Sequence, residues 1–131
     1  MVEYFETIKG FILDMGYVIA EENSAEQLVV INDEEKGIKN LVIDCEDPIV
    51  VLEQIIMEVP KSPNDLYKKL LQMNRTLVHG AFVLDEEGRT VIFRDTLCLK
   101  SLDRNELEGS IEALSLALAE NAEELLSSAK T

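Results

Sequence analysis

The sequence predicts an α+β fold in which an antiparallel β-sheet packs with three α-helices. Apolar residues recur every three or four positions near both ends of the chain and again around residues 66–77. Short β-branched runs fill the two intervals between these segments, and the brief turns between the runs favour antiparallel neighbours. The expected order is therefore helix, three or four strands, helix, two or three strands, helix, in a single domain over residues 1–131.

The first half of the chain is predicted to hold one helix and four strands. In the helix, residues 2–15, Phe5, Ile8 and Ile12 have helical spacing, and Gly16 is a natural end. The next strands are expected at residues 17–21, 27–31 and 38–45. Residues 49–59 are compatible with a strand or a helix by periodicity alone. Their β-branched content and the prolines on either side favour a strand.

The second half is predicted to hold two helices around a hairpin. Ser62 is the expected N-cap of the middle helix, with Pro63 at its first position and an end near His79 and Gly80. Strands are expected at residues 81–84 and 90–95, with residues 97–99 continuing the second strand or adding another. Asp103 is the expected cap of the last helix, with Glu106 three residues later as in a capping box.

Composition excludes several classes of function. The net charge of −14 argues against binding to nucleic acid or to an anionic membrane by simple electrostatics. No apolar run is long enough to span a bilayer. Acidic residues stand near the N-terminus where a signal peptide has basic ones, so Cys45 and Cys98 are expected to be reduced thiols of a cytoplasmic protein.

No catalytic, metal or cofactor motif is found, and the protein is not expected to be an enzyme. His79 is the only histidine, and it lacks a nucleophile in a matching motif. The acidic turns at residues 32–36 and 85–87 lack the ligand pattern of a calcium loop, so hairpin tips in solvent explain them better. Neither nucleotide-binding glycine motif is present.

Two features of the middle helix have more than one interpretation. Residues 61–79 carry a net charge of +3 within an acidic chain. They form either a solvated helix face, which we favour, or a patch that meets an acidic surface such as that of a second copy. Asn74, on an otherwise apolar stripe, is expected to bond backbone where the helix meets the hairpin.

The stretch LYKKLLQMNRTLVHGAFVLDEEGRTVIFRDTL and the acidic, leucine-rich last helix resemble the YbjN-like family. That family is similar in fold to the class I type III secretion chaperones, the Tir chaperone-like proteins. The shared pattern is Leu-Leu-x-x-Asn, a glycine, a strand that ends in aspartate, and a glycine turn. Here it is met by Leu70, Leu71, Asn74, Gly80, Asp85 and Gly88.

The resemblance implies a non-catalytic, chaperone-like or adaptor domain that binds another protein and forms a homodimer. A sheet with helices on one face leaves its other face in need of a partner. We expect the contact surface to include Val50, Leu52 and Ile56, together with the basic residues Lys68, Lys69 and Arg75. The alternative is a regulatory domain that binds a small molecule between sheet and helices.

Overall fold

The computed structural model describes residues 2–129 and has the predicted architecture, with three helices and one six-stranded antiparallel sheet. The helices are α1 (Val2–Asp14), α2 (Leu66–Asn74) and α3 (Arg104–Ala129). The strands are β1 (Val18–Asn23), β2 (Leu28–Asp33), β3 (Ile38–Glu46), β4 (Ile49–Glu58), β5 (Ala81–Leu84) and β6 (Thr90–Cys98). A single 3-10 turn, Glu34–Lys36, joins β2 to β3.

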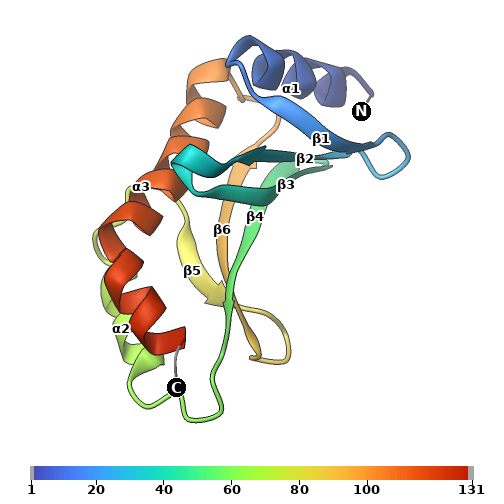
Figure 1. Cartoon of the computed structure of the whole chain (residues 1–131). Helices are drawn as coiled ribbons and strands as arrows, with labels where there is room; N and C mark the ends of the chain where they lie inside the picture. The colour runs from blue at the N-terminus through green and yellow to red at the C-terminus, as the bar shows by residue number, and fades with distance from the viewer. Residues whose placement is uncertain (1, 130–131) are drawn as a thin grey trace.

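The sheet has the strand order β1-β2-β3-β4-β6-β5, and all neighbours are antiparallel (Figure 1). The segment at residues 49–59 is a strand, as its β-branched content indicates. Residues 97 and 98 continue β6 rather than form another strand.

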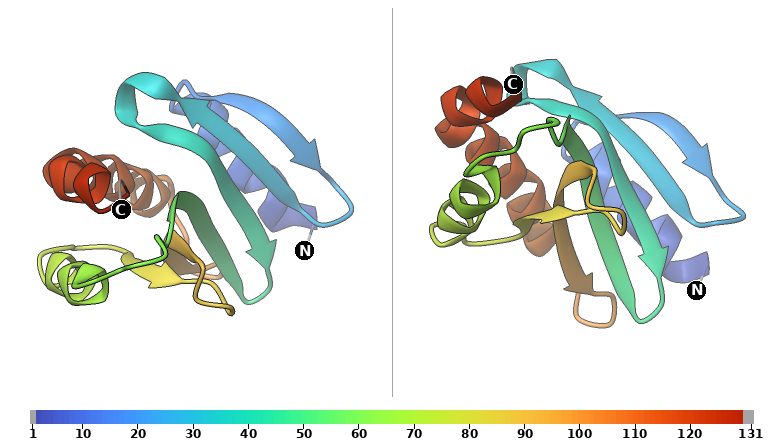
Figure 2. Two further views of the ribbon diagram at one scale, coloured as in Figure 1. Left: turned by 60° about the horizontal axis from the view of Figure 1, so that its bottom comes forward. Right: turned by 90° about the horizontal axis from the view of Figure 1, so that it is seen from below.

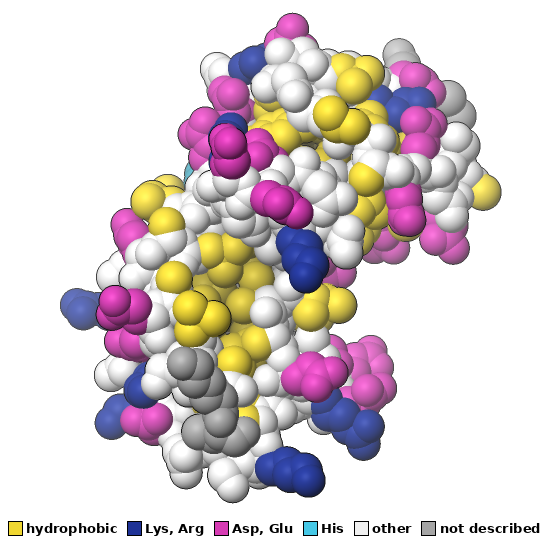
Figure 3. All heavy atoms as spheres, in the orientation of Figure 1, with side chains coloured by type: hydrophobic (Ala, Val, Ile, Leu, Met, Phe, Trp, Pro, Cys, Tyr) yellow, Lys and Arg dark blue, Asp and Glu magenta, His cyan; other side chains and the backbone are white. Residues whose placement is uncertain are grey.

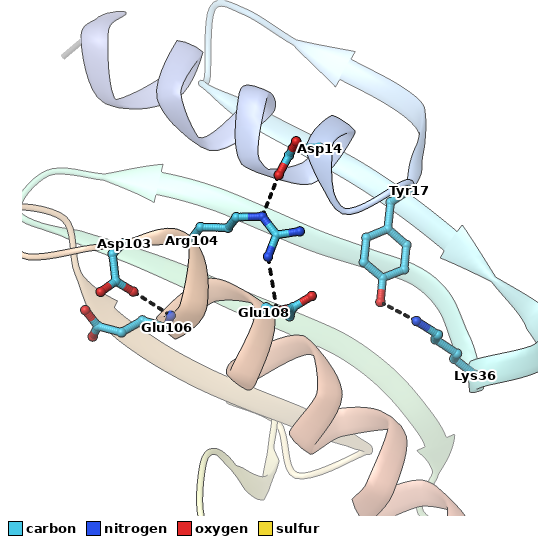
Figure 4. Close-up of polar contacts among 7 residues, drawn as sticks. All are labelled: Asp14, Tyr17, Lys36, Asp103, Arg104, Glu106 and Glu108. Carbon is cyan, nitrogen blue, oxygen red and sulfur yellow. Dashed lines mark hydrogen bonds and ion pairs between the residues drawn. The ribbon is translucent and has the colours of Figure 1, made fainter.

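One face of the sheet is covered by α1 and α3, and we call it the closed face. Its side chains join those of the two helices in a core from which solvent is excluded, with Ile8 and Ile12 of α1 and Ile111 of α3 at 1% exposure or less. At the edge of this core Arg104 of α3 binds Asp14 of α1 at 2.6 Å and Glu108 at 3.2 Å (Figure 4). The predicted cap of α3 is present, because the Asp103 carboxylate accepts a hydrogen bond from the backbone N–H of Glu106 at 2.7 Å.

The other face we call the open sheet face. In both views of Figure 2, α1 lies behind β2 and β3 while no helix of residues 2–129 lies in front of them. This arrangement confirms the expectation of helices on one face, and it leaves half of the sheet surface without a layer above it.

The middle helix is shorter than predicted at both ends. It begins at Leu66 and not at Pro63, because Asn64 has a left-handed φ of 50° and the Leu66 N–H bonds the Pro63 carbonyl in a turn. It ends at Asn74, six residues before Gly80, where 3-10 type bonds from Thr76 to Met73 and from Leu77 to Asn74 replace the helical pattern.

Asn74 has the role that the sequence predicts. Its side-chain amide donates to the Phe82 carbonyl at 3.1 Å and accepts from the Phe82 N–H at 2.8 Å. The amide therefore occupies the outer edge of β5 as a neighbouring strand would, and it fixes α2 against the sheet.

Candidate functional site

The open sheet face presents the alternate residues of each strand that the core does not use. On β4 these are Val51, Glu53 and Ile55, whereas Val50, Leu52 and Gln54 point to the closed face. The expectation that Val50 and Leu52 lie on a contact surface is therefore wrong. They are 0% and 2% exposed and pack beneath the helices. The residues that alternate with them on β4 are the ones that face away from the helices.

The cause of this error is visible on β4. The run is apolar on both faces, so the alternation that normally identifies the solvent face is weak. Gln54 is buried among apolar residues because its amide donates to the Gly37 carbonyl and accepts from the Lys39 N–H, both at 3.0 Å. The charge on Glu53, next to it, was the available signal that odd-numbered residues face outward.

A groove of about 610 Å³ crosses the open sheet face. Its apolar side chains come from three neighbouring strands, since Val42 lies on β3, Ile55 and Ile56 on β4, and Ile92 on β6. Ile55 pairs directly with Ile92 across the strands and is 70% exposed. An aliphatic pair at the centre of a sheet face, with one member largely exposed, is typical of an interaction surface rather than of a surface in solvent.

Ile56 remains part of the candidate surface. The β4–β6 register shifts between Ile55 and Met57, so Ile56 is the extra residue of a β-bulge. Its side chain lines the groove on the open sheet face and also a second groove of about 270 Å³ between β4 and the C-terminal half of α3. Hydrophobic side chains gather between α3 and the strands in Figure 3, where this second groove lies.

The first groove is lined by one cation, Lys39, and one carboxylate, Glu53, and the carboxylates of Asp44 and Glu46 lie farther along β3. The Glu53 carboxylate binds the Arg94 guanidinium across the strands at 3.0 Å, and both side chains are about 40% exposed. Asp44 lies opposite Val51 on the next strand and has no hydrogen bond or ion pair within the part of the chain that the structure describes. Partial burial and repulsion from Glu46, Glu26 and Glu53 raise the pKa of Asp44 above its ordinary value.

The three predicted basic residues lie elsewhere, on α2. Lys68 and Arg75 are exposed and Lys69 is half-buried, with its ammonium 3.7 Å from the Asp65 carboxylate. They flank an apolar cluster that we call the α2–β5 patch, made of the exposed residues Tyr67, Leu71 and Leu84 and the half-buried Val83. The patch surrounds a hollow of about 290 Å³ whose floor is formed by Leu70 and Phe82. Val83 pairs with Ile92, so the patch adjoins the groove on the open sheet face.

None of the helices between residues 2 and 129 has the length and apolar character that crossing a bilayer requires.

Known structures share this fold. YbjN from E. coli is 16% identical and has a TM-score of 0.73, with 95% of this chain and 94% of that chain aligned. A chain of the HopA1-SchA chaperone-effector complex is 12% identical with a TM-score of 0.63, over 88% and 91% of the two chains. The Yersinia pestis type III secretion chaperone SycH, solved in complex with a stable fragment of YscM2, is similar too. Its structure matches at 12% identity and a TM-score of 0.56, over 95% and 98%.

No curated protein matches the chain. The model of one family, CesT_Tir_1, matches residues 1–131, which is the whole sequence. The resemblance drawn from Leu70, Leu71, Asn74, Gly80, Asp85 and Gly88 is thereby confirmed. The chain belongs to the CesT_Tir_1 family, a family of type III secretion chaperones.

Proposed function

We propose that this protein is a non-enzymatic, chaperone-like or adaptor domain that binds a segment of another protein and acts as a homodimer. The observation that carries the proposal is the open sheet face, where an apolar groove crosses three strands without a covering layer. The family match supports it, and so do the structures of similar fold whose names describe chaperones with effector proteins or fragments. A cytoplasmic location stays a prediction.

Binding of a small molecule between sheet and helices is not favoured. Most of that space is filled by the core side chains of α1, α3 and the closed face. The larger groove lies on the other side of the sheet, and the groove of about 270 Å³ between β4 and α3 is lined by apolar side chains alone, without a polar group to orient a ligand.

The binding surface is tested by co-purification from the native host, followed by mass spectrometry. The wild-type protein is compared with Ile55→Asp, which places a charge at the centre of the groove, and with Leu116→Asp. Leu116 is exposed on α3 outside the grooves described above, so it is a matched control. We expect one dominant partner protein that Ile55→Asp loses and Leu116→Asp retains. Equal recovery by all three proteins would contradict the proposal.

For the dimer we propose the α2–β5 patch as the interface. Leu71 is 71% exposed and Tyr67 is 41% exposed, which is unfavourable for apolar side chains in a lone protomer. A stable interface buries on the order of 1,600 Å² in total, more than the patch alone provides, so the flanking residues Lys68, Lys69 and Arg75 would also take part.

Light scattering after size exclusion tests the dimer. We expect a dimer at micromolar concentration, a monomer for Leu71→Asp, and a dimer again for the control Leu116→Asp. Reversal of charge at Lys68 and Lys69 is expected to weaken the dimer if the basic helix meets an acidic surface of the second copy. A wild-type protein that is a strict monomer would refute the homodimer and leave the binding role standing.

A further inference from the structure

The open sheet face combines an apolar floor with carboxylates, of which Glu53 is paired with Arg94 and Asp44 has no cation beside it within the described residues. Val30 and Val51 are 8% and 3% exposed although neither belongs to the core between sheet and helices. They are screened by neighbours on their own face. The register places an acidic residue beside each, because Glu21 pairs with Val30, and Asp44 pairs with Val51.

Along β4 the outward residues read apolar, acidic, apolar, as Val51, Glu53 and Ile55. Residues two apart on a strand are separated by about 6.6–6.8 Å, and an extended chain laid on the sheet has the same spacing between side chains that face it. The complementary segment is therefore extended, with aliphatic, cationic and aliphatic side chains at positions i, i+2 and i+4.

The carboxylates of Glu53 and Asp44 determine that the side chain at position i+2 of the bound segment is cationic. Glu53 has an ion pair with Arg94, whereas Asp44, placed diagonally to it on β3, has none within the residues that the structure describes. Asp44 is partly desolvated and repelled by Glu46, Glu26 and Glu53, so a neighbouring cation would remove an existing electrostatic penalty. An acidic segment would add to that penalty, and the chain as a whole carries a charge of −14.

We propose that the open sheet face binds an extended segment of another protein in which every second residue faces the sheet, and these facing side chains are alternately aliphatic and cationic (lysine or arginine). The aliphatic side chains fill the groove over Val42, Ile55 and Ile92, and the cationic side chains lie between Asp44 and Glu53. This inference rests on the proposed function and specifies the chemistry of the partner.

The experiment uses three fluorescein-labelled peptides and the full-length protein, with binding followed by fluorescence anisotropy. The first peptide, called the alternating cationic peptide, repeats valine-serine-lysine-serine, so that valine and lysine alternate on the side that faces the sheet. The second has glutamate in place of each lysine. The third has the composition of the first, with its lysines grouped at one end.

We expect the alternating cationic peptide to bind at least about tenfold more tightly than either of the others, which corresponds to about 1.4 kcal/mol. Asp44→Lys should weaken its binding by about tenfold, and Asp44→Asn, which keeps the shape of the side chain, by a smaller factor. Glu123→Lys makes the same change in charge at an exposed site on α3 and should leave the affinity within about twofold. Circular dichroism and melting temperature verify that each variant is folded.

Three outcomes would overturn the inference. In the first, the alternating cationic peptide binds no better than the acidic peptide. In the second, Asp44→Lys and Glu123→Lys weaken binding equally, so that only overall charge matters. In the third, Asp44→Lys abolishes self-association, which would assign the face to a second copy of this chain.

Failure of the proposed binding role can be distinguished from failure of this inference. A native partner that is lost with Ile55→Asp but retained with Asp44→Lys would support the binding role and refute the cationic segment. If Ile55→Asp loses no partner, the binding role itself fails, whatever the peptides do.

Discussion

The two faces of the sheet are formed by the same strands, yet their polar side chains differ in whether they have a hydrogen-bond or ion-pair partner. On the closed face the polar side chains are few and paired, such as Ser110, whose hydroxyl donates to Asp95 at 2.7 Å. On the open face Asp44 lies among aliphatic side chains and other carboxylates without a partner in the described chain. Partial burial and the neighbouring carboxylates disfavour the charged form of Asp44, so the open face carries a small electrostatic cost that the closed face avoids.

The largest effect is expected from a matched pair of substitutions on β4. Leu52→Ala removes a side chain that is 2% exposed and should lower the free energy of unfolding by about 2–5 kcal/mol. Ile55→Ala, on the opposite phase and 70% exposed, should change it by less than about 0.5 kcal/mol. Urea denaturation measures both. Similar losses for the two variants would contradict the assignment of faces.

This pair also marks the limit of what the sequence could predict. The strand at residues 49–59 was identified correctly because β-branched content is a local property. Its phase was not, because the partner strands set the phase, and the run has apolar residues on both sides. Gln54 made the problem harder, since a polar residue buried by bonds to Gly37 and Lys39 looks like a surface residue in sequence.

Local hydrogen bonds were easier to predict than the ends of the middle helix. Asn74 and Asp103 have side chains that bond backbone a few residues away, and both roles are as expected. The start expected at Ser62 and Pro63 failed because Asn64 adopts a left-handed conformation, which no neighbouring residue indicates. The α2–β5 patch combines residues of a helix with residues of the strand that follows it. Their proximity depends on how the helix packs on the strand, so it could not be predicted from the sequence.

A second substitution probes the closed face where β5 begins. Gly80 has a φ of +75°, and a Cβ there would lie 2.5 Å from the ring of Phe93, which is buried in the core. Gly80→Ala should therefore cost about 2–4 kcal/mol, from strain and overpacking together. Gly88 has a similar φ of +71° but no atom within 4 Å of the added Cβ. Gly88→Ala should cost only about 1–2 kcal/mol in thermal or urea unfolding.

The reactivity of the two cysteines measures how accessible each face of the sheet is to solvent. Cys45 belongs to the core, and burial raises the pKa of its thiol to about 11. Cys98 is exposed, and hydrogen bonds from the Ser101 hydroxyl and from the backbone N–H groups of Ser101 and Lys100 lower the pKa of its thiol. Because the thiolate is the reactive form, Cys98 should react with Ellman's reagent at least about a hundredfold faster than Cys45 in the folded protein.

The Cys98→Ser variant is the control for this assay. It should show no rapidly reacting thiol until denaturant exposes Cys45. Rapid reaction of folded Cys98→Ser would mean that the closed face opens to solvent.

The smallest effect concerns Asp44. Its pKa is raised in the folded state, so the folded protein is favoured below the ordinary carboxyl value of 3.8, and that advantage is lost as the pH rises through the folded pKa. At neutral pH, Asp44→Asn should therefore stabilise the fold slightly, by less than about 1 kcal/mol after solvent screening, with no gain near pH 3. Melting temperatures across this range measure the difference.

For Asp85, the same assay should show a change in melting temperature of the opposite sign. Hydrogen bonds from the backbone N–H groups of Arg89 and Thr90 lower the pKa of its carboxyl, so its contribution is present at neutral pH and lost on acidification. Asp85→Asn should destabilise the protein at neutral pH and lose that effect in acid. If both variants shifted the melting temperature in one direction, Asp44 would be an ordinary hairpin-type carboxylate. In that case the open sheet face would carry no electrostatic penalty for a cationic partner to relieve.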